Sequence, residues 1–225
     1  MSLKEELDAF RSEFMAKVSP EIREAMVQAD MELAASGIAR NALKAGDRAP
    51  DFRLPDARGG YVRLKDLLAK GPVVVSFYRG GWCPYCNLEL RSLQNALSQI
   101  KRLGAELVAI SPQTPDESLS TAEKNELAFA VLSDIGSTTA KAFGIAFDLS
   151  KQLRPIYARF GHALPDKNGD NSWILPIPAT YVVDRDGTVA LAFVDVDYRN
   201  RLEPSEIFAV LQSLTKERDH SSAGV

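Results

Sequence analysis

The segment GGWCPYC at residues 80–86 constrains this chain more than any other, because it holds both of its cysteines, Cys83 and Cys86. It follows PVVVSFY at 72–78, an apolar and β-branched run that is typical of a strand buried on both faces. It precedes NLELRSLQNALSQIKRLG, where leucine and isoleucine recur at helical spacing before a glycine. The two thiols are therefore predicted to lie between the end of a buried strand and the first turn of a helix.

This position favours thiol chemistry. The unpaired N–H groups and the positive end of the helix dipole stabilise a thiolate at a helix start. In C-x-x-C turns of this kind one thiol has a lowered pKa, and the thiolate is the nucleophile. The spacing lets the second sulfur approach the first, so attack on an oxidised substrate can be followed by an intramolecular disulfide. Two inert buried cysteines are the structural alternative.

A single chain does not have enough residues of the right kind for a zinc site. Structural zinc is bound by four ligands, and beyond the two cysteines the chain offers only His162 and His220, which are widely separated. A site to which two chains each donate both cysteines is the remaining zinc hypothesis, and we rank it last. No flavin, haem or nucleotide fingerprint is present, so the sequence predicts neither a metal nor another cofactor.

The charge and hydropathy of the sequence limit which partners and which cellular compartment are expected. The formal net charge of the 225 residues is -3, and basic and acidic residues are mixed along the chain, which indicates no nucleic-acid surface. No apolar run approaches the roughly 20 residues that cross a bilayer, and the N-terminus has no leader pattern. These features predict a cytoplasmic protein without a membrane partner, in a compartment where permanent structural disulfides are rare.

Three segments follow from the pattern: a helical arm at 1–45, an α/β domain at 46–216 and a disordered tail at 217–225. The arm spaces Leu3, Leu7, Phe10 and Phe14 at helical intervals, so this stripe packs on the domain or forms a homodimer contact. In the domain, strand, helix and strand follow in the order of a right-handed parallel crossover. Residues 145–176 have a weaker pattern and are predicted to be an insertion near the site.

Three segments of the chain resemble a known protein family: GDRAPDF, FYRGGWCPYC and PATYVVDRDG. It is the alkyl hydroperoxide reductase / thiol-specific antioxidant (peroxiredoxin) family of the thioredoxin-fold superfamily, in particular its peroxiredoxin-like branch with a C-x-x-C. The resemblance covers about residues 44–214 and leaves out the arm. It implies a thioredoxin-like fold, in which helices flank a central mixed sheet, here with an N-terminal helical extension. It further implies a peroxidase that reduces hydroperoxides through a cysteine sulfenic acid, with thioredoxin or another thiol as reductant.

The family signature P-x-x-x-[TS]-x-x-C places Arg79 at the proline, Cys83 at the threonine or serine, and Cys86 at the reacting cysteine. Glu89 matches the C-x-x-E that often follows, as a proton relay or as a complement to the helix N-terminus. The arginine that the family carries just before the TYVVD strand is absent. The resemblance therefore predicts Cys86 as nucleophile and Cys83 as resolving cysteine. Arg79 is the candidate for the missing positive charge, and a solvated loop residue is the alternative for it.

Two features resemble thioredoxin instead: Trp82 precedes Cys83, and Pro178 stands where thioredoxin has a cis-proline facing its C-x-x-C. We therefore predict a cis bond before Pro178 that presents the backbone of Ile177 to a substrate, with an ordinary strand-edge proline as the alternative. Trp82 and Tyr85 either form an apolar rim for an organic peroxide or pack the turn.

Two functions compete with the peroxidase. In a dithiol–disulfide oxidoreductase, Cys83 attacks a disulfide of another protein and Cys86 resolves the mixed disulfide. In a redox-switched binding module, which is not an enzyme, disulfide formation rearranges the insertion and the arm to change a partner contact. Both enzyme mechanisms predict a Cys83–Cys86 disulfide.

Overall fold

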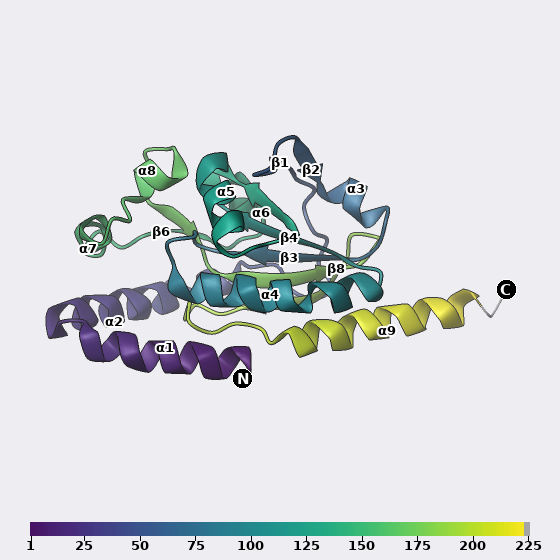
Figure 1. Cartoon of the computed structure of the whole chain (residues 1–225), viewed down its shortest axis with the longest axis horizontal. Coiled ribbons are helices and arrows are strands. Elements are labelled where there is room, and N and C mark those ends of the chain that lie inside the picture. Colours follow the sequence, from purple (N-terminus) through teal and green to yellow (C-terminus); the bar gives the residue numbers. More distant parts are fainter. Residues whose placement is uncertain (223–225) are drawn as a thin grey trace.

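A mixed five-stranded sheet forms the centre of the computed structural model, which describes the path of residues 1–222 and the side chains of residues 1–216. Its strands are β3 (Val73–Phe77), β4 (Glu106–Ser111), β5 (Ala130–Ser133), β8 (Ala179–Val183) and β9 (Val189–Val194). In the order β5-β4-β3-β8-β9, the first three strands are parallel to one another, and β8 is antiparallel to both of its neighbours (Figure 1). The predicted strand–helix–strand unit is thus confirmed as a parallel crossover.

Helices cover both faces of this sheet, because the apolar side chains of its strands alternate between two core clusters. Val74, Ala109 and Val182 lie in the cluster shared with α4 (Pro84–Arg102) and α9 (Pro204–Ser222). Val75 and Ile110 lie in the opposite cluster, against α3 (Leu64–Leu68) and α6 (Thr138–Ala142). A further helix, α5 (Pro115–Lys124), packs beside β5. The predicted α/β architecture is confirmed.

Two small antiparallel sheets flank the main one. The hairpin of β1 (Arg53–Pro55) and β2 (Tyr61–Arg63) turns at Gly59 and Gly60, which both have positive φ. The insertion begins with β6 (Ala146–Asp148) and ends with β7 (Ile174–Pro176), which pair with each other. Between them lie α7 (Arg154–Arg159) and α8 (Leu164–Asn168). The short 3₁₀ helices are η1 (Ile38–Arg40) and η2 (Ile135–Ser137).

The arm consists of α1 (Leu3–Lys17) and α2 (Pro20–Ala35). Ser2 and Glu5 form a capping box at the start of α1, and Ser19 caps α2. Leu3 and Leu7 are buried in the cluster that contains α4, and α2 buries Met26 against the insertion. Of the two predicted uses of the apolar stripe, packing on the domain is the one observed.

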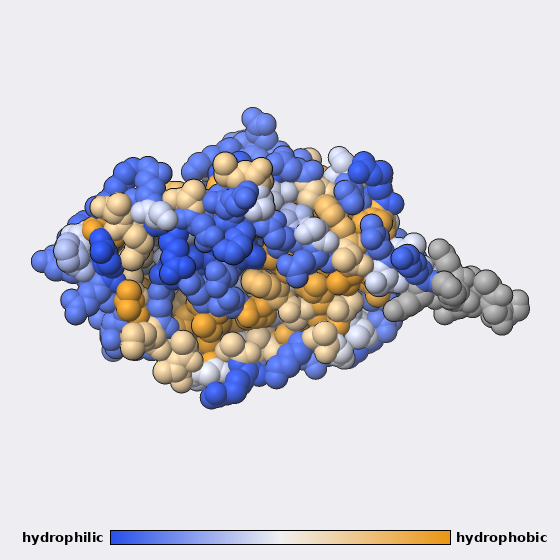
Figure 2. All heavy atoms as spheres, turned by 90° about the horizontal axis from the view of Figure 1, so that it is seen from below, coloured by the Kyte–Doolittle hydropathy of each residue, from blue (hydrophilic) through white to orange (hydrophobic). Residues whose placement is uncertain are grey.

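Figure 2 views the molecule from below, the side on which Figure 1 shows α1, α2 and α9, and apolar patches there lie among polar side chains. A homodimer contact on this side stays a prediction. Helix α9 continues to Ser222, so residues 217–222 of the predicted disordered tail are helical, while residues 223–225 lie outside the described part. Within residues 1–222, none of the helices has the length and apolar character that a membrane span needs.

Candidate active site

Both cysteines lie at the start of α4, directly after the central strand β3. Cys83 is the N-cap residue, Pro84 occupies the first helical position, and Cys86 follows in the first turn. Proline suits this position because its missing N–H has no partner in the first turn of a helix. The N–H of Asn87 donates to the carbonyl oxygen of Cys83 at 3.1 Å and closes the first turn. The predicted setting of the thiols at a helix N-terminus is confirmed.

The glycine pair before them is required by close packing. A Cβ on Gly80, whose φ is +153°, would lie 2.3 Å from Nε1 of Trp82. A Cβ on Gly81 would lie 2.2 Å from Oγ1 of Thr121. The N–H of Gly81 also donates to Oε1 of Gln113 at 2.7 Å. A larger residue would therefore force the side chain of Trp82 or Thr121 to move.

A buried ion pair lies behind Cys86. The Nε of Arg201 is 2.6 Å from Oε2 of Glu89, and Nη2 of the same guanidinium is 3.6 Å from Sγ of Cys86. Thr180 donates to the other carboxylate oxygen of Glu89 at 3.3 Å. Burial raises the pKa of Glu89 to about 7 although Arg201 opposes the shift. Glu89 thus holds the guanidinium that contacts Cys86.

Arg201 was missed by sequence reasoning, which noted that the family's arginine before the TYVVD strand is absent and nominated Arg79 in its place. It comes from the segment between β9 and α9, 115 residues after Cys86. The sequence around it, RNRLEP, has no pattern that marks a buried residue. Only the tertiary fold brings this charge to the sulfur.

Arg79 lies on the side of Cys83 and is 3% exposed. Its Nη2 donates to the hydroxyl of Tyr157 at 2.5 Å. The guanidinium carbon lies 4.3 Å from the ring centre of Tyr198 and 5.2 Å from that of Trp82, distances typical of cation–π contacts. Among the side chains of residues 1–216 no carboxylate forms an ion pair with Arg79, and its Nε has no hydrogen-bond partner. Its charge is therefore available to a thiolate.

The two thiols differ in pKa. Burial raises the pKa of Cys83, but the hydrogen bond with Cys86 and the positive charges of Arg79 and Arg201 outweigh it and lower that pKa to about 6. Burial and the hydrogen bond with Cys83 raise the pKa of Cys86 well above its ordinary value, against the effect of Arg201. These two directions favour Cys83 over Cys86 as the thiolate of the reduced pair.

A cavity of about 310 Å³ lies in front of Cys83. It brings together four of the predicted site residues: Arg79, Trp82, Cys83 and Tyr85. Cys86 is fully buried and is not among the residues that line it. The arm and the insertion supply the other walls, which confirms that the insertion lies near the site.

The two aromatic residues of the turn both pack and line this cavity. The ring of Trp82 stacks on His162 with 5.2 Å between ring centres, and its edge-to-face partner is Tyr157. Tyr85 is 3% exposed and meets the ring of Phe10 edge to face at 5.0 Å. The two predicted roles, rim and packing, are thus combined.

Pro178 lines a cavity that contains neither cysteine. No peptide bond in the described part of the chain is cis, so the predicted cis bond before Pro178 is wrong. The N–H of Ile177 donates to the carbonyl oxygen of Ile145 at 2.8 Å, and Ile177 is 1% exposed, so this N–H is used within the fold. This hydrogen bond anchors the residue before Pro178 to Ile145 at the start of the insertion.

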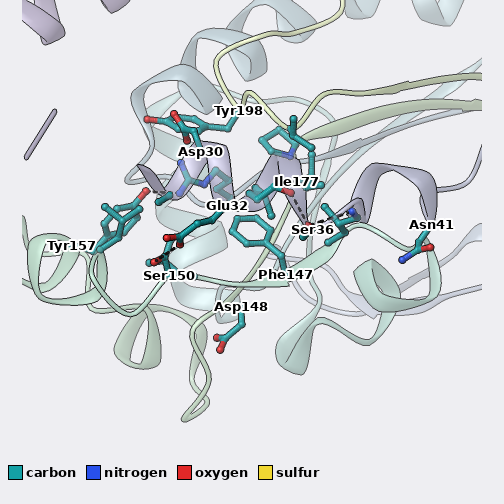
Figure 3. Close-up of a pocket in the computed structure, with 18 residues that line it drawn as sticks. Asp30, Glu32, Ser36, Asn41, Phe147, Asp148, Ser150, Tyr157, Ile177 and Tyr198 are labelled. Atoms are coloured by element: carbon teal, nitrogen blue, oxygen red, sulfur yellow. Dashed lines mark hydrogen bonds between the residues drawn. The ribbon is translucent and has the colours of Figure 1, made fainter. Parts of the chain in front are cut away.

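Ile177 and Pro178 line a second cavity of about 450 Å³ (Figure 3). In Figure 3, Asp30 and Glu32 of α2 approach it from one side, and Phe147 and Ser150 from the insertion. Arg79, Tyr157 and Tyr198 line both cavities and separate them. This second cavity contains neither cysteine.

Known proteins with similar sequences are peroxiredoxins. The family model described as AhpC/TSA family matches residues 45–192. The chain is 32% identical over 173 residues to "Peroxiredoxin Q, chloroplastic" of Sedum lineare, covering 75% of this chain and 78% of that protein. It is 36% identical over 105 residues to "Peroxiredoxin Bcp" of Escherichia coli, covering 47% of this chain and 67% of that protein.

Solved structures agree with the fold. The crystal structure of peroxidoxin BcpB from Mycobacterium tuberculosis superposes with a TM-score of 0.60 at 26% identity, over 76% of this chain and 97% of that one. This similarity confirms the predicted thioredoxin-like fold, to which the arm is an addition. The match over residues 45–192 includes the cysteine turn, β3, α4 and β8. The chain belongs to the AhpC/TSA family of peroxiredoxins.

Proposed function

We propose that this chain is a thiol-dependent peroxidase that reduces hydroperoxides and passes the oxidation to a Cys83–Cys86 disulfide. The observation that carries the proposal is the place of Cys83 on the wall of a cavity, with a second buried cysteine, Cys86, in the same helical turn. Membership of the peroxiredoxin family supports an enzyme rather than a redox-switched binding module. A small substrate fits this arrangement, because Cys83 is only 2% exposed.

The chemistry requires two steps. A thiolate attacks one oxygen of the hydroperoxide, an S–O bond forms as the O–O bond breaks, and the departing oxygen leaves as an alcohol or water after taking up a proton. The sulfur has lost two electrons and is now a sulfenic acid. The second sulfur displaces its hydroxyl group, so that water leaves and an S–S bond forms. A dithiol reductant, thioredoxin or another thiol, then returns both cysteines to thiols.

The structure bears on which sulfur attacks first. The family signature predicts Cys86, and the contact between Cys86 and Arg201 supports that order. The lower pKa of Cys83 and its place on the cavity wall favour the opposite order. We propose that Cys83 attacks and Cys86 resolves, because the attacking group must be both ionised and within reach of the substrate.

Stopped-flow mixing with hydrogen peroxide tests both parts, with tryptophan fluorescence as the signal. We expect Cys83→Ser to slow the reaction about a thousandfold or more. Cys86→Ser, its matched control, reacts once and stops at a sulfenic acid, seen by mass spectrometry after trapping. If Cys86→Ser abolishes the reaction and Cys83→Ser stops at a sulfenic acid, Cys86 is the attacking cysteine.

The same variants test the competing enzyme mechanism. If hydrogen peroxide does not oxidise the wild type while an oxidised dithiol protein exchanges rapidly with Cys83, the protein is a dithiol–disulfide oxidoreductase. A thiol-dependent change in partner binding without turnover would indicate a binding module. Neither outcome is compatible with the peroxidase. The cytoplasmic location stays a prediction, since one relative is described as chloroplastic.

A further inference from the structure

The arm forms one wall of the cavity in front of Cys83. Phe10 and Phe14 of α1 and Met26 of α2 line it together with Ile156 and Phe160 of the insertion. Phe10 is held in place by its edge-to-face contact with Tyr85 in the cysteine turn. The family model begins at residue 45, so this wall is built by a segment outside the part of the chain that the family shares.

The wall that the arm and the insertion supply is mainly apolar and aromatic, whereas Cys83 and the cationic residue Arg79 line the opposite part of the cavity. A ligand with a polar reacting group beside Cys83 and an apolar body toward the arm matches both parts.

We propose that the N-terminal arm selects the substrate: Phe10, Phe14 and Met26 hold the compact apolar body of an organic hydroperoxide while its O–O group lies at Cys83. This inference rests on the proposed peroxidase function and adds a substrate preference to it. Hydrogen peroxide has no apolar body and gains nothing from this wall. An aryl or branched alkyl hydroperoxide fills a cavity of about 310 Å³ and buries its hydrocarbon surface against aromatic rings.

The test compares second-order rate constants for oxidation of the reduced protein by cumene hydroperoxide and by hydrogen peroxide. For the wild type we expect cumene hydroperoxide to react about tenfold faster, the scale of discrimination that a small apolar pocket provides. In Phe14→Ala, which removes part of the wall, the ratio of the two rate constants falls about tenfold. In Met26→Trp, which fills the cavity, the ratio falls as well.

Val27→Ala is the matched control. Val27 neighbours Met26 on α2, is 46% exposed and does not line the cavity, so this variant keeps the wild-type ratio. An unchanged ratio in both Phe14→Ala and Met26→Trp would overturn the inference. So would an equal fall of both rate constants, which would assign the arm a role in folding alone. If the wild type reacts with neither peroxide, the proposed function fails; if it reacts equally with both, only the substrate preference fails.

Discussion

The surroundings of Cys83 and Cys86 differ in how positive charge is compensated, although the two residues belong to the same helical turn. Arg201, behind Cys86, is paired with the buried carboxylate of Glu89. Arg79, beside Cys83, is surrounded by aromatic rings and one tyrosine hydroxyl, with no carboxylate partner among the described side chains. An uncompensated buried cation attracts an anion more strongly than a compensated one. The uncompensated charge of Arg79 therefore adds to the interaction with Cys86 in lowering the pKa of Cys83.

The largest expected effect concerns folding on the Cys86 side. Arg201→Met leaves Glu89 buried without its partner, and breaking a buried ion pair in this way costs about 3–5 kcal/mol of the free energy of unfolding. Chemical denaturation measures this loss. In the double variant Glu89→Gln/Arg201→Met this pair leaves no buried charge unpaired, and we expect most of the stability to return. A single variant as stable as the wild type would mean that Glu89 is protonated in the folded protein.

The matching substitution beside Cys83 tests whether the two arginines differ in their effect on stability. Arg79→Met removes a buried charge without leaving a carboxylate unpaired, so its free energy of unfolding should change by less than about 1.5 kcal/mol, the scale of one hydrogen bond. Denaturation curves of Arg79→Met and Arg201→Met under identical conditions provide the comparison. Equal losses would contradict the distinction between the two arginines.

The next effect is the pH dependence of the wild type. Because the pKa of Cys83 is lowered to about 6, the thiolate fraction rises as pH increases through that value. The rate constant with hydrogen peroxide should therefore rise about tenfold from about pH 5 to pH 7 and then level off. Thiolate absorbance in Cys86→Ser and in Cys83→Ser assigns the titration to one sulfur. A midpoint that follows Cys86 would reverse the assignment.

The smallest effect is the shift of that profile in Arg79→Met. Without the guanidinium charge the pKa of Cys83 should rise by about one unit, which lowers the rate constant about fivefold near pH 6. Arg79→Lys keeps the charge but loses the planar contacts with Tyr198 and Trp82, so we expect a smaller shift. If Arg79→Met leaves the midpoint unchanged, the hydrogen bond from Cys86 and the charge of Arg201 suffice to ionise Cys83.

Much of the fold could be predicted because its signals are local. The β-branched run of β3, the helical spacing of α4 and the Asp-Arg-Asp-Gly turn between β8 and β9 each identify an element within a few residues. The position of the thiols at a helix start follows from the same neighbouring residues. The arm was predicted as helices, but its periodicity alone left open whether it packs on the domain or on a second chain.

The rest of the site depends on contacts between distant residues. Arg201 reaches Glu89 across 112 positions and Cys86 across 115, and no local pattern records either contact. Pro178 was misassigned because a resemblance to thioredoxin at one position does not include the pairing of Ile177 with Ile145. Such contacts depend on how strands pair and where loops lie in the fold. The residues next to each position in the sequence do not reveal them.

The sequence by itself determined the redox pair, its place at a helix N-terminus, and the fold and family in which it lies, since each depends on residues close together in the chain. Only the tertiary structure decided which sulfur lines the cavity, which arginine lies near each sulfur and what forms the wall opposite Cys83. The physical reason is that pKa values and cavities depend on burial and on charges within a few ångströms, and here those charges come from segments far apart in the sequence.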